Sequence, residues 1–477
     1  MIEEIGKVKI ARRDLRHKER PLIGNKNYDS LPDECYSLGQ SDEYYENLKN
    51  IGQALGGAVR EDILKSMRDI AFDLRLFEET RQYESTQVSL LRSWTARTVR
   101  HQLNRIAHGG RLKDRYFIKY TFPAVEADLH PPTLDFKVDP DSQPASNIHV
   151  IIGRNGAGKT TLFRRISLCF LDPGSENIGT ISDAERPQVT PVVNLVSVAF
   201  SAFDPFEPVD IREYNASISY NYVGLRKELT SEDGSRQSSL KDTDELALEF
   251  VDSLDEIISA GRVETWLKAI EHINNDANFA EYELSSMVSI PRPANRASER
   301  ATIHKRNARR AFRKMSSGHK IVLLTLSRLV HLVEERSLIL IDEPESHLHP
   351  PLLAAFIRAL SDLLDTRNGI AFIATHSPVV LQEVPASCVS ILRRYGDLYS
   401  VHRPETETFG EAVGVLTHGV FDLEVQGSGF HKEISRAVER YTTYEEVMAS
   451  FGGQVGGEGR ALIRVLLNAK LRNENRR

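Results

Sequence analysis

The strongest indication of the fold is the segment Gly153-Arg-Asn-Gly-Ala-Gly158-Lys159-Thr160. It fits the phosphate-binding pattern G-x-x-x-x-G-K-[ST], whose backbone N–H groups converge on a β-phosphate. The apolar run Ile148–Ile152 precedes it and the amphipathic segment Thr160–Phe170 follows it, so the sequence predicts a strand, a loop and a helix. We expect Gly156 and Gly158 to adopt positive φ, which lets the backbone approach a phosphate closely. These residues predict an ATP·Mg²⁺ site.

The helix that begins near Lys159 should point the positive end of its dipole at the phosphates. Lys159 is expected to reach the β/γ oxygens, and the Thr160 hydroxyl is expected to bind Mg²⁺. The predicted ATP-binding residues are Gly153, Arg154, Asn155, Gly156, Ala157, Gly158, Lys159, Thr160 and Thr161.

A second motif, Leu338-Ile-Leu-Ile-Asp342-Glu343-Pro344-Glu345, is an apolar strand that ends in two adjacent acids. Doubly wound sheets bind ligands where the strands end at their carboxyl edge. The position of Asp342 therefore favours Mg²⁺ binding through water, and that of Glu343 favours polarising the attacking water. Taken alone, the pattern also fits a strand that ends in a polar turn.

Two weaker patterns surround this strand. Ala374-Thr375-His376-Ser377-Pro378 follows the next apolar run, where a single histidine is more often a capping or surface residue. Met315-Ser316-Ser317-Gly318-His319-Lys320 precedes a predicted helix and offers a second anion site at its N-terminus. Ser-Gly turns cap many helices, so the meaning of this motif depends on its place before the acidic strand.

Strands alternating with helices predict parallel βαβ units. Residues 1–113 form the predicted N-terminal helical region, with a loose arm over 1–30 and one helix face at Ile63, Met67, Ile70 and Leu74. Residues 114–403 form the predicted ATPase head, with a helical insertion at about 228–314 that begins with a polar loop over 228–243. Residues 404–477 form a predicted C-terminal helical tail.

The composition is that of a soluble globular protein, with 61 basic and 67 acidic residues and a net charge of −6. A nucleic-acid contact would therefore need a local patch. The three cysteines do not indicate a disulfide framework or a zinc cluster, and no signal core or membrane span is seen. A cytoplasmic location is expected.

In this order, the motifs resemble the ABC/SMC ATPase superfamily, and we expect its P-loop head. The resemblance implies that His376 contacts the γ-phosphate. It also implies that Ser316, Ser317 and Gly318 of one protomer complete the site of another, with two ATPs between two heads of a homodimer or higher oligomer. One departure concerns the Mg²⁺-contacting Gln of the superfamily: in Phe200–Phe206 either Ser201 or Asp204 could replace it, and the sequence does not choose between them.

A narrower resemblance is to the ATPases of Septu-type and retron-associated anti-phage defence systems. It lies in Phe200–Phe206, Thr408–Thr417 and Phe421–Glu424. The segment Asp342–Pro350 resembles the form found in bacterial anti-phage and overcoming-lysogenization-defect ATPases. The resemblance to the Septu-type and retron-associated ATPases implies a sensor or switch subunit that acts with a separate HNH-type nuclease. In the retron case it also implies a reverse transcriptase with its DNA–RNA product.

Three alternatives stay open at this point. One is an SMC-like DNA repair or recombination ATPase without a toxic partner, another is a transporter-type head, and the third is a regulatory ATP-binding module with negligible turnover. The tail is too short for a Toprim nuclease, and its histidines, His418 and His431, are interpreted as surface groups. The basic run with Arg306, Arg309, Arg310 and Arg313 fits either a nucleic-acid or dimer contact or a helix paired with acidic neighbours.

Overall fold

The structure is a computed structural model of the whole chain. It describes residues 5–13, 15, 29–92, 94–110, 113–124, 130–185, 192–199, 218–230, 236–274, 279, 281–288, 297–419 and 429–474. Within these ranges the hydrophobic residues form separate cores: one within residues 11–107, two layers within 116–416, and one within 434–467. The cores leave gaps between residues 107 and 116 and between 416 and 434, and the boundaries near 113 and 403 stay predictions.

A seven-stranded sheet forms the centre of the head, in the order β14-β13-β5-β12-β11-β7-β8. The strands are β14 (Leu398–His402), β13 (Val389–Tyr395), β5 (Ile148–Ile152), β12 (Ile370–Thr375), β11 (Ser337–Asp342), β7 (Asn194–Ala199) and β8 (Ser219–Gly224). Only β14 pairs antiparallel; every other neighbouring pair is parallel. The predicted parallel α/β sheet is thus confirmed, and its apolar runs reflect burial on both faces.

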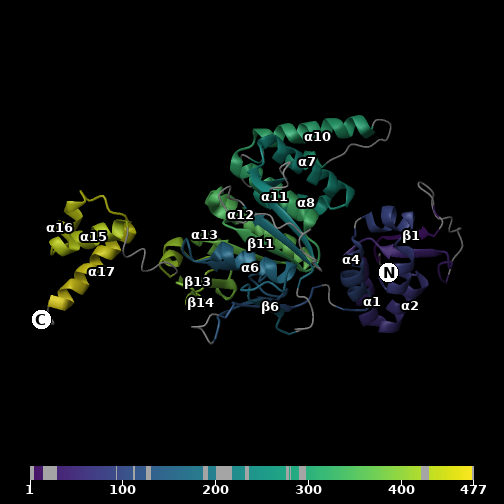
Figure 1. Cartoon of the computed structure of the whole chain (residues 1–477), viewed down its shortest axis with the longest axis horizontal. Helices are drawn as coiled ribbons and strands as arrows, with labels where there is room; N and C mark the ends of the chain where they lie inside the picture. Colours follow the sequence, from purple (N-terminus) through teal and green to yellow (C-terminus); the bar gives the residue numbers. More distant parts are fainter. Residues whose placement is uncertain are drawn as a thin grey trace.

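The two faces of this sheet are covered differently (Figure 1). One face packs against α7 (Thr243–Ser259), α8 (Val263–Ile273), α11 (Ser317–Leu332) and α12 (Pro350–Arg367). The other packs against α6 (Lys159–Leu171) and a small antiparallel sheet of β3 (Tyr116–Thr121), β4 (Thr133–Val138) and β6 (Thr180–Asp183). The head is therefore a layered P-loop fold in which α6 lies on the side of the small sheet.

The insertion begins differently from the prediction. Where a polar loop was expected over 228–243, β9 (Arg226–Thr230) and β10 (Arg236–Leu240) pair as an antiparallel hairpin. The helical part of the predicted insertion begins with two helices, α7 and α8, which are separated at Gly261, whose φ is +68°. A third helix, α10 (Ala297–Lys314), lies along α7.

The N-terminal region is not purely helical. β1 (Val8–Arg12) falls within the expected loose arm but pairs antiparallel with β2 (Cys35–Gly39). Around this hairpin lie α1 (Asp42–Leu55), α2 (Gly57–Ser66), α3 (Leu74–Thr80), α4 (Ala96–Thr98) and α5 (Asn104–Ala107). The sequence missed β1 because its partner strand lies more than twenty residues away, across a polar segment.

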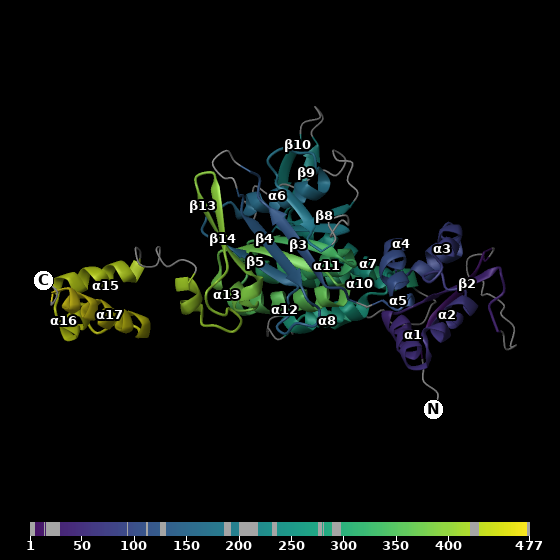
Figure 2. The same cartoon turned by 90° about the horizontal axis from the view of Figure 1, so that it is seen from below.

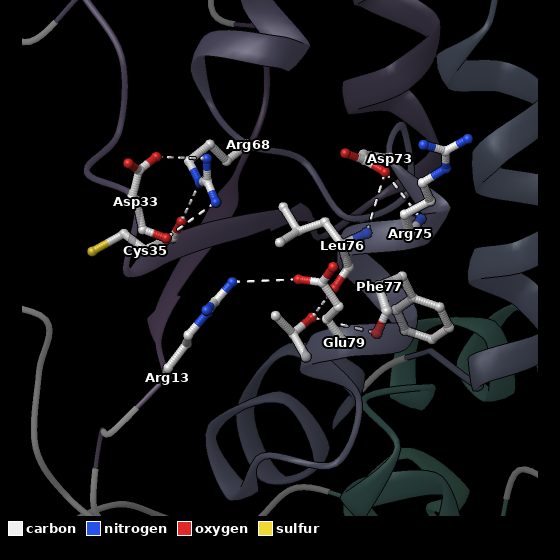
Figure 3. A network of polar contacts seen from close by, with 10 residues as sticks. Arg13, Asp33, Cys35, Arg68, Asp73, Arg75, Leu76, Phe77 and Glu79 are labelled. Carbon is white, nitrogen blue, oxygen red and sulfur yellow. Dashed lines mark hydrogen bonds and ion pairs between the residues drawn. The ribbon is translucent and has the colours of Figure 1, made fainter.

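The expected helix through Ile63, Met67, Ile70 and Leu74 is also wrong: α2 ends at Ser66. Arg68 has a left-handed backbone (φ +45°), and its guanidinium donates hydrogen bonds to Asp33 and to the Cys35 carbonyl oxygen (Figure 3). The Asp73 carboxylate then caps α3 by accepting from the next two free N–H groups. Contacts with β2 therefore override the helical periodicity.

The N-terminal unit and the C-terminal helices lie at opposite ends of the head (Figure 2). The N-terminal unit is joined to the head by Arg105, whose guanidinium lies 2.5 Å from the buried Glu335 carboxylate. The C-terminal unit consists of α15 (Gly429–Arg440), α16 (Tyr444–Ser450) and α17 (Gly457–Glu474), packed on their own apolar core.

Candidate nucleotide-binding site

The phosphate loop lies between β5 and the 13-residue helix α6. Gly156 and Gly158 have φ of +80° and +88°, as the loop pattern predicts. Gly153 is constrained for another reason: a Cβ there would lie 2.5 Å from the carbonyl oxygen of Leu392 in β13. The exposed Arg154, Asn155 and Gly156 leave the outer side of the loop open to a ligand.

Lys159 is held inside this loop. Its side chain is 4% exposed, and Nζ donates to the carbonyl oxygens of Gly153 (3.0 Å) and Arg154 (3.3 Å). Burial lowers the pKa of Lys159, while the Glu343 carboxylate, 4.0 Å away, opposes that shift, as does Asp342. The ammonium is thus positioned by the backbone at the base of the loop, with the predicted residues Ala157, Thr160 and Thr161 beside it in sequence.

The strand ends meet at one edge of the sheet. Asp342 at the end of β11 is in register with Ala374 of β12 and with Ala199 of β7. Thr375 of β12 is in register with Ile152, the last residue before the phosphate loop. Asp342 is 1% exposed at this edge. The register of the parallel strands therefore brings together the carboxylates, the phosphate loop and the residue after β12.

Glu343 has a left-handed backbone, with φ +44° and ψ +59°. A non-glycine residue in this region costs about 1–3 kcal/mol, and such strain often occurs at active sites. Here the turn is held by the Glu343 N–H donating to the Ala374 carbonyl oxygen at 2.9 Å. The turn directs the half-buried Glu343 side chain toward Lys159 and His376, whose Nδ1 lies 3.4 Å from Glu343 Oε1.

Glu345 is a site residue that sequence reasoning missed. Its Oε1 accepts from the Thr375 hydroxyl (2.6 Å) and the His376 N–H (2.8 Å), and lies 3.2 Å from His376 Nδ1. It therefore fixes both the backbone and the ring of His376. The available signal was a third acid two residues after Glu343, on the same short turn Pro344–Ser346.

The Ser-Ser-Gly turn lies at the N-terminus of α11. Ser316 caps the helix by accepting from the His319 N–H, and its Oγ lies 2.5 Å from His319 Nδ1. A Cβ at Gly318 would meet the His347 carbonyl oxygen at 2.7 Å, so the turn packs tightly beside the segment after Glu343. Ser316 and Ser317 are exposed. The described hydrogen bonds of Ser316 stay within this cap and do not reach the phosphate loop.

Two other predicted groups have different outcomes. Ser201 and Asp204 lie outside the described residues. On α10, Arg309 and Arg313 form ion pairs with Asp244 of α7 at 3.9 and 2.5 Å. Arg306 and Arg310 are exposed, and no ion pair is described for either in the part of the chain that the structure covers. The nucleic-acid contact of this helix remains a prediction, and two of its four predicted arginines are paired within the chain.

The layered parallel sheet and the phosphate loop at its carboxyl edge give this protein the fold of a P-loop nucleotide-binding domain. A family described as "AAA domain, putative AbiEii toxin, Type IV TA system" matches residues 226–382, which include Ser316–Gly318, Asp342, Glu343 and His376. Protein ea59 of Escherichia phage lambda is 38% identical over 461 residues, covering 93% of this chain and 85% of that protein. The chain belongs to the family of protein ea59.

Solved structures similar to this chain include the following three. A metal-chelate type ABC transporter in an inward-facing conformation has a TM-score of 0.31 and 14% identity, covering 65% of this chain and 89% of its own. The ADP form of MJ1267, an ATP-binding cassette of an ABC transporter, has a TM-score of 0.31 and 15% identity, covering 66% of this chain and 99% of its own. UvrA2 from Deinococcus radiodurans has a TM-score of 0.32 and 12% identity, covering 67% of this chain and 42% of its own. These TM-scores are too low to support an inference about this chain.

Within the described ranges, no helix combines the length and the apolar character needed to cross a membrane.

Proposed function

We propose that this protein binds and hydrolyses ATP and uses the nucleotide state to control a partner. The observation that carries the proposal is the convergence of Lys159, Asp342, Glu343 and His376 at one edge of the sheet. A buried cation, a buried carboxylate, a half-exposed carboxylate and a histidine are the groups that phosphoryl transfer to water requires.

Each side chain suits one task. Lys159 meets the β/γ oxygens, Glu343 polarises the attacking water, and His376 donates to the γ-phosphate. The left-handed turn holds Glu343 while Glu345 holds His376, so both are positioned before substrate binds. Preorganised groups of this kind cost no rearrangement when charge develops in the transition state.

The residues also fit a Mg²⁺ ion. Asp342 supplies a buried carboxylate at the edge of the sheet, and Thr160 supplies a hydroxyl in the first turn of α6. When bound, the ion would neutralise charge on the β- and γ-phosphates.

We further propose that a second copy of the chain completes the site, giving a homodimer or higher oligomer. Ser316 and Ser317 are exposed at a helix N-terminus, while their described contacts stay within the cap. N–H groups at such an end suit an anion supplied by a partner.

Glu343→Gln tests the hydrolytic role. The amide preserves size but loses the charge that polarises water, so turnover should fall about 10²–10⁴-fold while ATP binding persists. ATP binding by calorimetry and phosphate release are measured on the same protein. Normal turnover would assign the task to another residue.

Sharing of the site is tested with two variants that are each inactive. Ser316→Arg should block the partner's γ-phosphate, and Lys159→Ala should lose ATP in its own head. When the two are co-expressed, each mixed dimer has one intact composite site out of two. Each mixed dimer should therefore recover up to about half of the wild-type rate if the sites are independent. Full activity of Ser316→Arg alone would refute the shared site.

The partner we propose is an HNH-type nuclease of an anti-phage defence complex, with a retron reverse transcriptase and its DNA–RNA product in the retron case. The resemblance to Septu-type and retron-associated ATPases supports this proposal. The segment 408–417, which carries part of that resemblance, exposes Phe409, Val413 and Val415. These apolar side chains are available to a partner.

Co-purification tests this part of the proposal. The genes beside the one for this chain are first searched for an HNH protein. Such a protein, co-expressed with the Glu343→Gln variant and purified in the presence of ATP, should co-purify with it and arrest growth when released. A Phe409→Ser/Val415→Ser variant should lose the partner and keep its ATPase activity. Stable growth and no association would favour an SMC-like repair ATPase without a toxic partner.

A further inference from the structure

A histidine–carboxylate cluster joins the end of the head to the C-terminal helices. His418 lies on a short helix over residues 413–419, His431 on α15 and Glu458 in the first turn of α17. Their ligand atoms all lie within 4.8 Å of one another. Among the described residues, this is the one group of three or more His, Cys, Asp or Glu side chains with such geometry.

The two separations measured from the Glu458 carboxylate fit coordination to one metal ion. Two ligands about 2.05 Å from a tetrahedral ion are about 3.4 Å apart. His418 Nε2 lies 3.2 Å from Glu458 Oε1, and His431 Nε2 lies 3.8 Å from the same oxygen. The second distance is too long for a hydrogen bond but suits two atoms bound to the same cation.

His431 gives an independent indication. Its side chain is 6% exposed, and its buried Nε2 has no hydrogen-bond partner. An unpaired polar atom costs about 1–3 kcal/mol when buried, and a bound metal would remove that cost. Glu458 is 57% exposed, so the cluster is open to solvent on one side. That opening provides an entry path and space for a water as fourth ligand.

We propose that His418, His431 and Glu458 bind a divalent transition-metal ion of the Zn²⁺ class. Two imidazoles and one carboxylate form a set that Zn²⁺ accepts, and the absence of a thiolate sets it apart from Cys-rich structural sites. Because His418 belongs to the head's last helix and the other two to the C-terminal unit, the ion ties the two together. The site is remote in sequence from the ATP-binding residues and does not depend on the function proposed for them.

Metal titration of the full-length protein tests the site. After chelator treatment, Zn²⁺ is titrated against a chromophoric competitor with excess Mg²⁺ present. We expect one high-affinity Zn²⁺ per chain, and Glu458→Gln and His431→Ala should each weaken it at least about 100-fold, more than the loss of an outer-shell partner. Glu458→Gln alters an exposed side chain and so keeps the test valid if His431→Ala disturbs packing.

His272→Ala is the matched control. His272 Nε2 lies 2.7 Å from the Asp362 carboxylate. These two residues form a histidine–carboxylate pair like that in the cluster, but without a second histidine beside it. Its loss should leave Zn²⁺ affinity unchanged. Co²⁺ should give visible bands of low-symmetry N/O coordination without sulfur charge transfer, since Cys35, Cys169 and Cys388 are buried elsewhere. Equal Zn²⁺ affinity in wild type, Glu458→Gln and His431→Ala would overturn the proposal.

Spin labels test the tie between the units. Val415 and Val465 are 46% and 64% exposed, one on each side of the cluster. With cysteines introduced at both positions, one equivalent of Zn²⁺ should narrow the distance distribution, and chelation should broaden it again. A distribution that does not respond to Zn²⁺ would overturn the tie.

Discussion

Acid should destabilise the ATPase core through one histidine, His149, in the strand that leads into the phosphate loop. It is 2% exposed, and its ring lies edge-on to Phe136 and Phe372 at 5.3 and 6.3 Å between centroids. Burial, aided by the Arg403 charge, lowers the pKa of His149 from 6.5 to about 3. The folded protein therefore keeps this imidazole neutral where the unfolded chain protonates it.

The magnitude follows from the difference between the two pKa values. Between about pH 6.5 and 3 the unfolded state binds more protons, so stability is full above pH 6.5 and is lost as pH falls. At pH 5 the free energy of unfolding is lower by about 2 kcal/mol because of His149, whereas at pH 7.5 it is lower by only about 0.1 kcal/mol. His149→Gln cannot titrate, so its pH 5 loss should be smaller by about 2 kcal/mol, whatever its cost at neutral pH.

The assay is urea denaturation at the two pH values, read by tryptophan fluorescence. The chain has two tryptophans, of which Trp266 is fully buried in the core of the head and Trp94 belongs to the N-terminal unit. A Trp94→Phe background therefore reports the head. If His149→Gln lost as much stability at pH 5 as the parent, the reasoning would be refuted, since another group would then carry the acid sensitivity.

Three further predictions concern single side chains. Lys159→Ala should weaken ATP binding about ten- to a hundredfold, because a charge-assisted contact is worth about 1.5–3 kcal/mol; calorimetry checks this, and unchanged affinity would remove the loop assignment. Burial raises the pKa of Asp69 to about 6, so the free energy of unfolding of the N-terminal unit should rise by about 1.4 kcal/mol as the pH falls from 7.5 to 5, opposite in sign to the change in the head. Urea denaturation read by Trp94 fluorescence in a Trp266→Phe background should show this rise, and Asp69→Asn should abolish it. Glu345→Ala should lower kcat about tenfold by releasing His376; in a double-mutant cycle with His376→Ala the losses should not add, and additive losses would mean that the two act separately.

Local patterns in the sequence were sufficient to predict the sheet and to place the candidate nucleotide-binding residues together at its edge. The loop Gly153–Thr160, the acids Asp342 and Glu343, and His376 each follow an apolar run directly. Because parallel strands end at the same edge, reading each run as a strand also places the residues after it together. The side chains of Lys159, Glu343 and His376 meet at that edge.

Contacts between distant segments were decided by the tertiary structure alone. β1 forms because β2 supplies hydrogen bonds from more than twenty residues away, and α2 ends because Arg68 reaches Asp33 and Cys35. The ion pairs of Arg309 and Arg313 with Asp244 are also contacts between distant segments, because they form only where α10 lies along α7.

His418 and His431 show most clearly what the sequence alone does not predict. In the sequence they are isolated histidines in a polar tail, and Glu458 is one acid among many. The packing of α15 on α17 buries one imidazole and brings a carboxylate and a second imidazole to it. Periodicity and motif spacing describe neighbours along the chain, whereas a ligand cluster depends on which helix faces meet, and that is set by packing over the whole C-terminal unit.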